Sequence, residues 1–563
     1  MTDRRPKYLP TALHHNHHRS PEFAPPFTMK LLRILPCLLL VGLASAAEPA
    51  PKRPNVLFIV IDDLRPELGC YGKDYIKSPN IDALAKTGMV FDRAYCQQAV
   101  CSPSRTVVMT GVRPDTSKVW DLVTHFRKAL PDVVTLGEDF KAHGYFVQGM
   151  GKIFHGTLND PPTWSVPWTN PKAPVYALAD DADLIGKNVE PVDEDGPDNQ
   201  GASPKAYVLP KASNAYPENE TDHADTPAAK KKAKKGKGGD SEGGKANSRG
   251  PIYESADVPD NYFQDGMTAD LAVQTLDQIS KKSEPFFLAV GFRKPHLPWV
   301  APKKYWDLYD PATLALAPNP YLPVDAPEYA INPNDGEFRA YKGVPGRGDV
   351  PPALAHKLKQ AYFAGVSYSD AQVGRVLAEL DRLGLRENTI VILWGDHGWK
   401  LGEHDAWGKH TNTENDTNAP LILSVPGMKN AGAHSNALVE FVDMYPTLCD
   451  LAGVPQPKTL EGLSFRPLLD HPALPWKSAA FSQYPRGQNG GLMGYSMRTD
   501  RYRLTVWVGR KDPTRVDAIE LYDHQVDPQE NINIAKKPEN AGLVDQLLKQ
   551  WRAGWRGALP AAN

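Results

Sequence analysis

Cysteine is scarce in this sequence, with five residues among 563. Cys37 lies in an apolar N-terminal run, and the remaining cysteines show no Cys-x-x-Cys spacing: Cys70, Cys96, Cys101 and Cys449. This pattern argues against both a disulfide-stapled scaffold and a cysteine-ligated zinc site. The roles open to these residues are buried structural thiols, one reactive thiol, or pairing among Cys70, Cys96 and Cys449 in an oxidising compartment, which their spacing does not decide.

Net charge is also small, because 64 Lys and Arg face 66 Asp and Glu, for a formal charge of -2. No overall field favours nucleic acid or a membrane surface as a partner, so recognition has to be local. The length predicts one large domain and one smaller domain. The 44 Gly, 53 Pro and 12 Trp suit a loop-rich α/β enzyme.

The N-terminal apolar run, Ile34–Leu43, is too short for a stable membrane anchor. It follows the basic residues Lys30 and Arg33 and precedes Ala-Ser-Ala at 44–46, so residues 29–46 are predicted to be a secretory signal peptide. Residues 1–28 precede this leader and are interpreted as an extension from a misassigned start rather than a histidine-rich metal-binding tail. The mature protein is therefore expected to be secreted or periplasmic, with no membrane attachment after cleavage.

Three apolar runs end in polar clusters. Asn55–Ile61 is followed by Asp62 and Asp63, Pro285–Val290 by the sequence RKPH, and Thr389–Leu393 by GDH. Such runs are typical of central parallel strands, whose carboxyl ends meet at one edge of an open α/β sheet. The sequence therefore predicts that these polar side chains share one site.

Helical spacing between these strands predicts amphipathic helices over Asp265–Ser280 and Leu354–Leu383. Residues 224–250 are rich in Lys and Gly and nearly devoid of apolar residues, so we expect a disordered surface insertion rather than a nucleic-acid-binding element. Short strands and a terminal helix after residue 470 predict a smaller α+β subdomain over 471–560, behind a catalytic domain over 52–470.

The most specific local motif is Cys101-Ser102-Pro103-Ser104-Arg105, followed by Thr110-Gly111. It resembles the signature of the formylglycine-dependent type I sulfatases, in which a maturation enzyme oxidises the cysteine to an aldehyde. The resemblance implies that one hydroxyl of the hydrated aldehyde attacks sulfur and the other later expels sulfate. Without the motif, Cys101 reads as a buried structural thiol. Without conversion to the aldehyde, the protein is interpreted as a non-catalytic binder of sulfated glycans.

The same resemblance assigns a divalent cation, expected to be Ca²⁺, to the carboxylates of the strand ends. Its ligands are Asp62, Asp63, Cys101, Asp396 and His397. Taken pair by pair, the aspartates have helix capping or salt bridges as an alternative role. The histidine is less typical of calcium than an amide is.

The resemblance further implies that Arg105 and Lys152 orient the formylglycine and that His155 takes the proton from its remaining hydroxyl. His296 and Lys409 would bind the sulfate, together with Lys152, and help the alkoxide leave. Asp396 would be the base for the attack. Each of these residues has a solvated or packed role as its alternative.

The resemblance covers nearly the whole mature chain, including NVLFIVIDDLRPELGCYG, GKIFHG, PFFLAVGFRKPHLPW, GDHGWKLGEH and SQYPR. Within the family these stretches are similar to the iduronate-2-sulfatases. They imply an alkaline-phosphatase-like α/β core, with a mainly parallel central sheet flanked by helices and a smaller C-terminal subdomain. They also imply exo-action on a 2-O-sulfated uronate of a sulfated oligosaccharide.

Two residues near Lys409 depart from that pattern. Asp405 stands where the family tolerates a small residue, and Asn418 stands where a basic residue is common. We expect both residues to change the shape of the pocket that binds the sugar. The alternatives that remain are a sulfatase for another sulfated polysaccharide, and a phosphodiesterase or phosphonate hydrolase of the same superfold.

Overall fold

The computed structural model describes residues 53–178, 249–332, 336–487 and 491–561, which belong to one compact unit. The predicted extension 1–28, the predicted leader 29–46 and residues 224–248 of the predicted insertion lie outside these ranges. Arg249 and Gly250, the last two residues of the predicted insertion, belong instead to strand β5 (Arg249–Pro251). No helix in the described ranges is long and apolar enough to cross a membrane.

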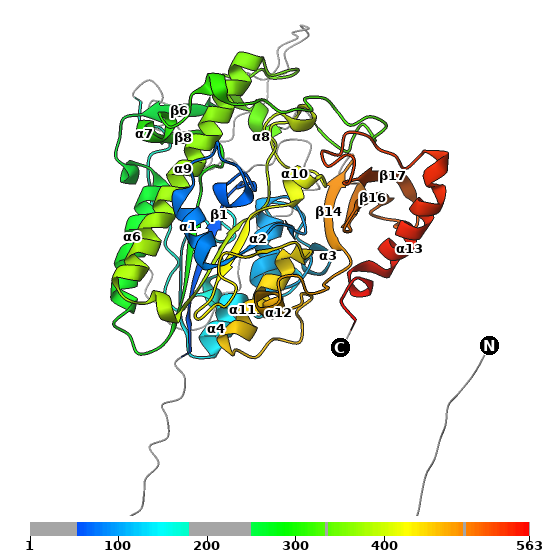
Figure 1. The fold of residues 1–563 in the computed structure, drawn as a ribbon. Coiled ribbons are helices and arrows are strands. Elements are labelled where there is room, and N and C mark those ends of the chain that lie inside the picture. Colours follow the sequence, from blue (N-terminus) through cyan, green and yellow to red (C-terminus); the bar gives the residue numbers. More distant parts are fainter. Residues whose placement is uncertain (1–52, 179–248, 333–335, 488–490, 562–563) are drawn as a thin grey trace, which may run out of the picture. The chain divides into compact units, whose positions relative to one another are not determined.

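A central sheet runs through the fold (Figure 1). It has seven strands in the order β12-β2-β11-β10-β1-β7-β4. Strand β1 pairs in parallel with β10 and β7, and β7 pairs in parallel with β4, whereas β11 is antiparallel to both of its neighbours. The strands are β1 (Asn55–Ile61), β2 (Met89–Phe91), β4 (Phe146–Gly151), β7 (Phe286–Phe292), β10 (Thr389–Gly395), β11 (Leu421–Ser424) and β12 (His434–Ser435). The predicted mainly parallel sheet is confirmed.

Strand β1 lies inside the sheet between β10 and β7, and every one of its seven residues is buried. Leu57, Ile59 and Ile61 point to one face of the sheet, and Val56, Phe58 and Val60 point to the other, as the two-residue period of a strand requires. Both sets join large apolar clusters. A continuous apolar sequence therefore forms a strand covered on both sides.

Helices cover the two faces of the sheet (Figure 1). On one face lie α1 (Pro79–Thr87), α6 (Gln264–Ile279) and α9 (Pro352–Arg382); on the other lie α2 (Cys101–Thr110), α4 (Leu136–Ala142), α11 (Met444–Ala452) and α12 (Arg466–Asp470). Helices α6 and α9 match the segments predicted from their apolar spacing, with ends shifted by one or two residues. The order of elements is that of a layered α/β fold.

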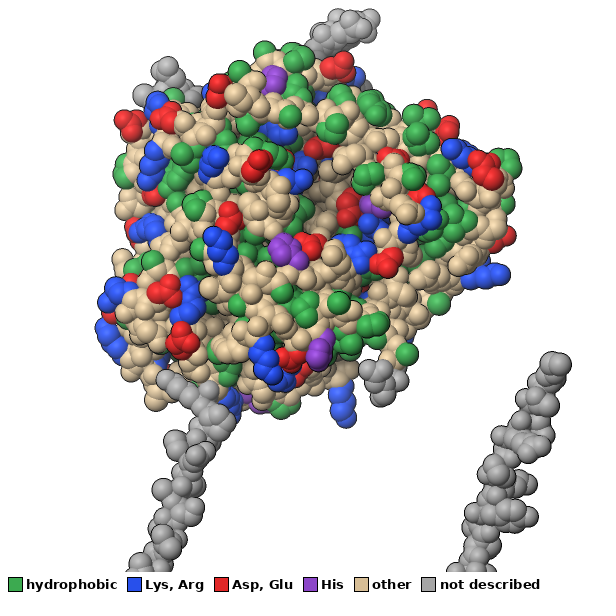
Figure 2. Space-filling view, viewed as in Figure 1, with side chains coloured by type: hydrophobic (Ala, Val, Ile, Leu, Met, Phe, Trp, Pro, Cys, Tyr) green, Lys and Arg blue, Asp and Glu red, His purple; other side chains and the backbone are tan. Residues whose placement is uncertain are grey.

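Short elements join the main layers. The helices are α3 (Pro114–Ser117), α7 (Lys303–Trp306), α8 (Gly336–Arg339) and α10 (Glu414–Thr417). The strand pairs are β3 (Ala94–Tyr95) with β13 (Val439–Glu440), β5 with β9 (Tyr341–Lys342), and β6 (Tyr253–Ala256) with β8 (Trp299–Pro302). On the face shown in Figure 2, basic and acidic side chains are interspersed, in keeping with the small net charge.

The C-terminal part is an antiparallel sheet with one long helix against it. Its strands are β14 (Ala480–Arg486), β15 (Leu492–Arg498), β16 (Tyr502–Gly509) and β17 (Val516–Asp523), and α13 (Ala541–Gly557) shares their apolar cluster. Strand β14 is bonded to the core, because Gln483 N donates to Gln97 O at 2.8 Å and Ser482 Oγ donates to Cys96 O at 2.6 Å. The predicted α+β character of this region is confirmed.

Candidate active site

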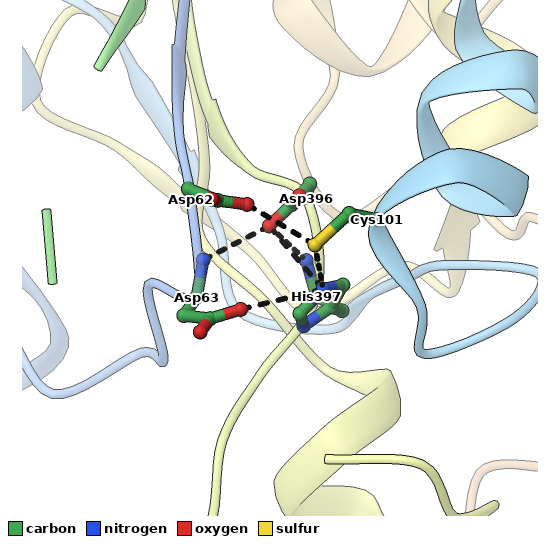
Figure 3. Close-up of side chains that lie close together, drawn as sticks. All are labelled: Asp62, Asp63, Cys101, Asp396 and His397. Atoms are coloured by element: carbon green, nitrogen blue, oxygen red, sulfur yellow. Dashed lines mark hydrogen bonds and ion pairs between the residues drawn. The ribbon is translucent and has the colours of Figure 1, made fainter. Parts of the chain in front are cut away.

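Five potential metal ligands converge at the carboxyl edge of the central sheet (Figure 3). Two follow β1, two follow β10, and one begins α2: Asp62, Asp63, Asp396, His397 and Cys101. One ligand atom from each lies within 4.8 Å of all the others, and all five residues are buried. The parallel pairing of β1 with β10, with Ile61 opposite Gly395, brings the two pairs together. The predicted ligand set therefore forms one cluster.

Cys101 is the first residue of α2, a helix in which every residue is buried. Its Sγ lies 3.2 Å from Asp62 Oδ1, 3.2 Å from His397 Nε2 and 3.3 Å from Lys409 Nζ. The thiol thus points into the carboxylate cluster rather than into an apolar core, which is unusual for a structural cysteine.

Arg105 lies one helical turn after Cys101 and is fully buried. Its Nε donates to Asp396 Oδ2 at 2.9 Å, and its Nη2 donates to Asp62 Oδ1 at 3.1 Å. Its Nη1 donates to the carbonyl oxygens of Lys152 and Ile153. The guanidinium therefore ties the ends of β1 and β10 to the loop after β4.

Two lysines enter the cluster from different loops. Lys152 follows β4, and its Nζ lies 2.5 Å from Asp62 Oδ2 and 3.7 Å from Cys101 Sγ. Lys409 lies in the loop after β10, and its Nζ donates to Asp63 Oδ1 at 2.7 Å and sits 5.3 Å above the ring of Trp399. Both ammonium groups are placed to neutralise an anion bound beside Cys101.

His296 faces the same cluster from the loop after β7. Its Nε2 lies 4.0 Å from both Asp62 Oδ2 and Asp63 Oδ2, while Nδ1 lies 2.6 Å from the carbonyl oxygen of Leu297. Since a carbonyl only accepts, Nδ1 carries a hydrogen and Nε2 is the atom presented to the site. His155 is also buried, three residues after Lys152, and its assigned role stays a prediction.

Comparison with known proteins agrees with this geometry. The sulfatase family model matches residues 54–454, and the model of the C-terminal part of N-sulphoglucosamine sulphohydrolase matches residues 402–554. The iduronate 2-sulfatase of Mus musculus is 33% identical over 93% of this chain and 100% of its own length, and that of Homo sapiens is 32% identical over 90% and 96%. This chain belongs to the sulfatase family. As a sulfatase, it is a sulfuric ester hydrolase.

Solved structures share the fold of this sulfatase. A 2-O glycosaminoglycan sulfatase superposes with a TM-score of 0.60 at 21% identity, covering 90% of this chain and 93% of its own. The phosphonate monoester hydrolase of Silicibacter pomeroyi superposes with a TM-score of 0.64 at 22% identity, covering 90% and 96%. The predicted alkaline-phosphatase-like sulfatase architecture is confirmed, and at these identities the likeness concerns the fold.

The charges around Cys101 shift the pKa values of the sulfatase's buried carboxyls in opposite directions. Burial opposes ionisation of Asp62, but Lys152, His296 and Arg105 hold its pKa well below the usual range. Burial raises the pKa of Asp396, and the charge of Asp62 raises it further. Neighbouring carboxyls whose pKa values are pushed apart are typical of functional sites.

The donor set of the sulfatase fits a hard divalent cation. Three carboxylates and an imidazole converge, and carboxylate oxygens are the ligands that such cations prefer. The backbone of Asp63 adopts a left-handed conformation, with φ of 59°. It is held there because its N–H donates to Asp396 Oδ1 at 3.0 Å and its carbonyl accepts from Tyr362 Oη at 2.7 Å. A non-glycine residue fixed in this region is a feature found often at functional sites.

A second group of ligand-type residues in the described ranges contains Glu414, His524 and Glu530. Arg503 pairs with both glutamates, and Arg498 pairs with Glu414 at 3.1 Å. These ion pairs tie α10 to the C-terminal sheet. They give the group a structural explanation and leave it unlike the second metal centre of a phosphatase.

Two residues that contact the site have no assigned role in the sequence-based prediction. Trp399, whose ring lies beneath Lys409, follows the GDH motif after Gly398, and an aromatic residue so close to the motif is a usable signal. Glu337, whose Oε1 lies 3.7 Å from His296 Nε2, comes from a loop-rich stretch without a motif, so nothing in the sequence marked it.

The two departures from the family pattern lie in different surroundings. Burial and the charge of Asp349 raise the pKa of Asp405, while Arg339 opposes the shift. Asn418 lines a cavity of about 830 Å³ together with Arg65, Tyr75 and Lys359. No residue of the Cys101 cluster is among the lining residues of this cavity, and the predicted influence of both departures on sugar selection stays a prediction.

Proposed function

We propose that this sulfatase removes sulfate from a sulfated glycan and that its nucleophile is formylglycine, produced from Cys101 by a maturation enzyme. The observation that carries the proposal is the position of Cys101 Sγ. It lies 3.2 Å from Asp62 Oδ1 and 3.3 Å from Lys409 Nζ, in the middle of the convergent cluster. The hydrated aldehyde supplies a hydroxyl that attacks sulfur and a second hydroxyl through which sulfate is released.

The residues around Cys101 provide the charge and proton transfers that the reaction needs. Lys152 and Lys409 bind the sulfate oxygens and offset the charge that develops on them, because their ammonium groups already approach Sγ at 3.7 and 3.3 Å. Asp396 accepts the proton of the attacking hydroxyl, and His155 accepts the proton of the second hydroxyl. Arg105 orients the first turn of α2.

Departure of the sugar alkoxide requires a proton, which we assign to His296. Its Nδ1 is occupied by the carbonyl of Leu297, so Nε2 is the nitrogen that faces the reacting groups. The charges of Asp63 and Glu337 outweigh its burial and raise the pKa of His296. A raised pKa favours the imidazolium form, which is the form that can donate a proton to the leaving oxygen.

We propose Ca²⁺ as the metal, held by Asp62, Asp63, Asp396, His397 and the group derived from Cys101. Three carboxylates suit calcium, and the bound ion would polarise a sulfate oxygen as a Lewis acid. We further propose that the protein is exported through its 29–46 leader and acts outside the cytoplasm, where sulfated oligosaccharides are met.

The substrate that we propose is a 2-O-sulfated uronate at the non-reducing end of a glycan. The support is the similarity to relatives named iduronate 2-sulfatase, at 33% and 32% identity over most of both chains. Asp405 and Asn418 mark where the sugar pocket departs from these relatives. Another sulfated polysaccharide is the second candidate for that reason.

The test is a panel of substrates given to protein in which the aldehyde has been verified. Free sulfate would be measured after incubation with a disaccharide ending in 2-sulfated iduronate and with other sulfated disaccharides. Hydrolysis of a phenyl phosphonate monoester would be measured separately as released phenol. We expect sulfate release from the first disaccharide, none from Cys101→Ala, and full activity from the matched thiol variant Cys449→Ala, since Cys449 is buried away from the cluster.

Release from another disaccharide alone would refute the uronate assignment and keep the sulfatase chemistry. Faster turnover of the phosphonate than of every sulfate ester would refute the proposed substrate class.

A further inference from the structure

Glu337 is a third carboxylate close to His296, besides the two that follow β1. It lies in α8 and is 3% exposed, and its Oε1 is 3.7 Å from His296 Nε2. This is the same nitrogen that faces Asp62 and Asp63, each at 4.0 Å. Three carboxylates thus surround one edge of the imidazole ring.

The three carboxylates differ in their other partners. Asp62 is paired with Arg105 and Lys152, and Asp63 is paired with Lys409. Both also belong to the ligand cluster around Cys101. Glu337 is not a member of that cluster, and its carboxylate is paired with His296 and with Arg249.

Glu337 is itself fixed from behind. Arg249 Nη1 lies 3.5 Å from Glu337 Oε1, and the guanidinium of Arg249 stacks over the ring of Tyr341 at 5.3 Å. Strand β5 carries Arg249 and pairs with β9, which carries Tyr341. A buried carboxylate held in this way occupies a defined position rather than a range of rotamers.

The backbone beneath His296 is also held independently. Asp265 accepts the N–H groups of Arg293 and Lys294 at 2.8 and 2.7 Å, and Ser369 Oγ donates to the carbonyl of Lys294 at 2.6 Å. The loop after β7 therefore has backbone anchors of its own, apart from the contact between Glu337 and the imidazole of His296.

We propose that Glu337 is a positioning residue for leaving-group departure: it holds His296 with Nε2 toward the oxygen that leaves sulfur. The inference rests on the proposed role of His296 in the reaction. The effect of Glu337 passes through His296, the residue of the site that its carboxylate approaches at 3.7 Å.

This role gives a signature that a merely structural residue lacks. A sugar alkoxide or a simple phenolate needs a proton to leave, whereas a nitrophenolate leaves readily without one. Loss of the positioning contact should therefore slow the hydrolysis of esters with basic leaving groups and leave the hydrolysis of esters with acidic leaving groups nearly unchanged. The loss should appear in kcat, because the sulfate group binds through Lys152 and Lys409 in either case.

The experiment compares Glu337→Gln, His296→Ala and the double variant on a series of substituted phenyl sulfates, using calcium-loaded protein with verified aldehyde. We expect Glu337→Gln to match the wild type within about twofold on 4-nitrophenyl sulfate and to lose about tenfold or more in kcat on phenyl sulfate, a part of the range typical of general acids. In the His296→Ala background, Glu337→Gln should cause no further loss.

Glu520→Gln is the matched control, since Glu520 is a buried glutamate in β17 bonded to Trp507 and Tyr522, outside the site. An equal loss on all esters, a loss confined to KM, or a further loss in the His296→Ala background would each overturn the positioning role. Wild-type protein that hydrolyses none of the sulfates would instead refute the proposed function, and the inference would fall with it.

Discussion

Replacement of Arg105 by methionine tests the electrostatic design of the site without relying on activity. Arg105 is fully buried and bridges Asp62 and Asp396 through contacts of 3.1 and 2.9 Å. Methionine keeps much of the apolar volume and removes the charge. In Arg105→Met, Asp62 retains Lys152 at 2.5 Å, whereas Asp396 loses the guanidinium.

The expected cost follows from that asymmetry. Removing one partner of a buried ion pair costs about 3–5 kcal/mol. Because the pKa of Asp396 is already raised, this carboxyl takes up a proton in the variant, and the loss near neutral pH should stay at the lower end, about 3 kcal/mol. A carboxyl whose pKa is raised in the folded state destabilises the fold more as pH rises. The loss in free energy of unfolding caused by Arg105→Met should therefore grow between pH 6 and pH 8.

The assay is urea unfolding, followed by tryptophan fluorescence, with EDTA or with saturating Ca²⁺. Calcium supplies positive charge next to Asp396, so the loss should shrink by about 1 kcal/mol or more in its presence. The exposed residue Arg552 provides the control Arg552→Met, for which we expect a change within about 0.5 kcal/mol. A loss below about 1 kcal/mol in EDTA, or the same loss with and without calcium, would refute the reasoning.

Three other perturbations have defined outcomes. Lys409→Ala should raise KM and lower kcat for sulfate esters by about tenfold or more each, since it removes a donor to the sulfate; unchanged steady-state kinetics would remove Lys409 from the site. Glu440, bound by both terminal nitrogens of Arg113, has a pKa lowered from 4.5 to about 2, against the effect of burial, by the charges of Arg113 and Lys477. Glu440→Gln should therefore cost about 3 kcal/mol at pH 7 in unfolding experiments, and the difference should disappear as pH falls from about 4.5 toward 2; a pH-independent difference would contradict this. A methyl group on Gly291 would lie 2.2 Å from the carbonyl oxygen of Lys152, so Gly291→Ala should lower the free energy of unfolding by about 1–3 kcal/mol and reduce activity; wild-type values in both assays would contradict the contact.

The sequence predicts the parts of this fold that depend on local pattern. Strand β1 has the predicted bounds because a continuous apolar run buried on both faces leaves no other arrangement. The sequence also predicts short strands over 495–498 and 502–508. They correspond to β15, which begins earlier at Leu492, and to β16, which ends one residue later at Gly509. Strand β17 was missed since its first four residues are not buried, and β14 was missed since it contains Pro485, which does not fit a central strand.

The residues of the candidate site also fall into those that the local sequence pattern predicts and those that it does not. Asp62, Asp63, Asp396 and His397 directly follow apolar strands, so their convergence is predictable from the geometry of parallel sheets. The pairing of Lys409 with Asp63 joins residues 346 positions apart, and only the resemblance to a family indicated it. Glu337 reaches His296 through tertiary packing of a short helix, which no local pattern encodes.

The central claim is that the aldehyde form of Cys101 performs sulfate ester hydrolysis, and the most direct test relates the two quantities. Preparations made with increasing amounts of the maturation enzyme would be analysed by peptide mass for the aldehyde fraction at Cys101 and assayed for sulfate release. We predict that activity rises in proportion to the aldehyde fraction and extrapolates to zero for the thiol form. Activity that is independent of the aldehyde fraction would contradict the account.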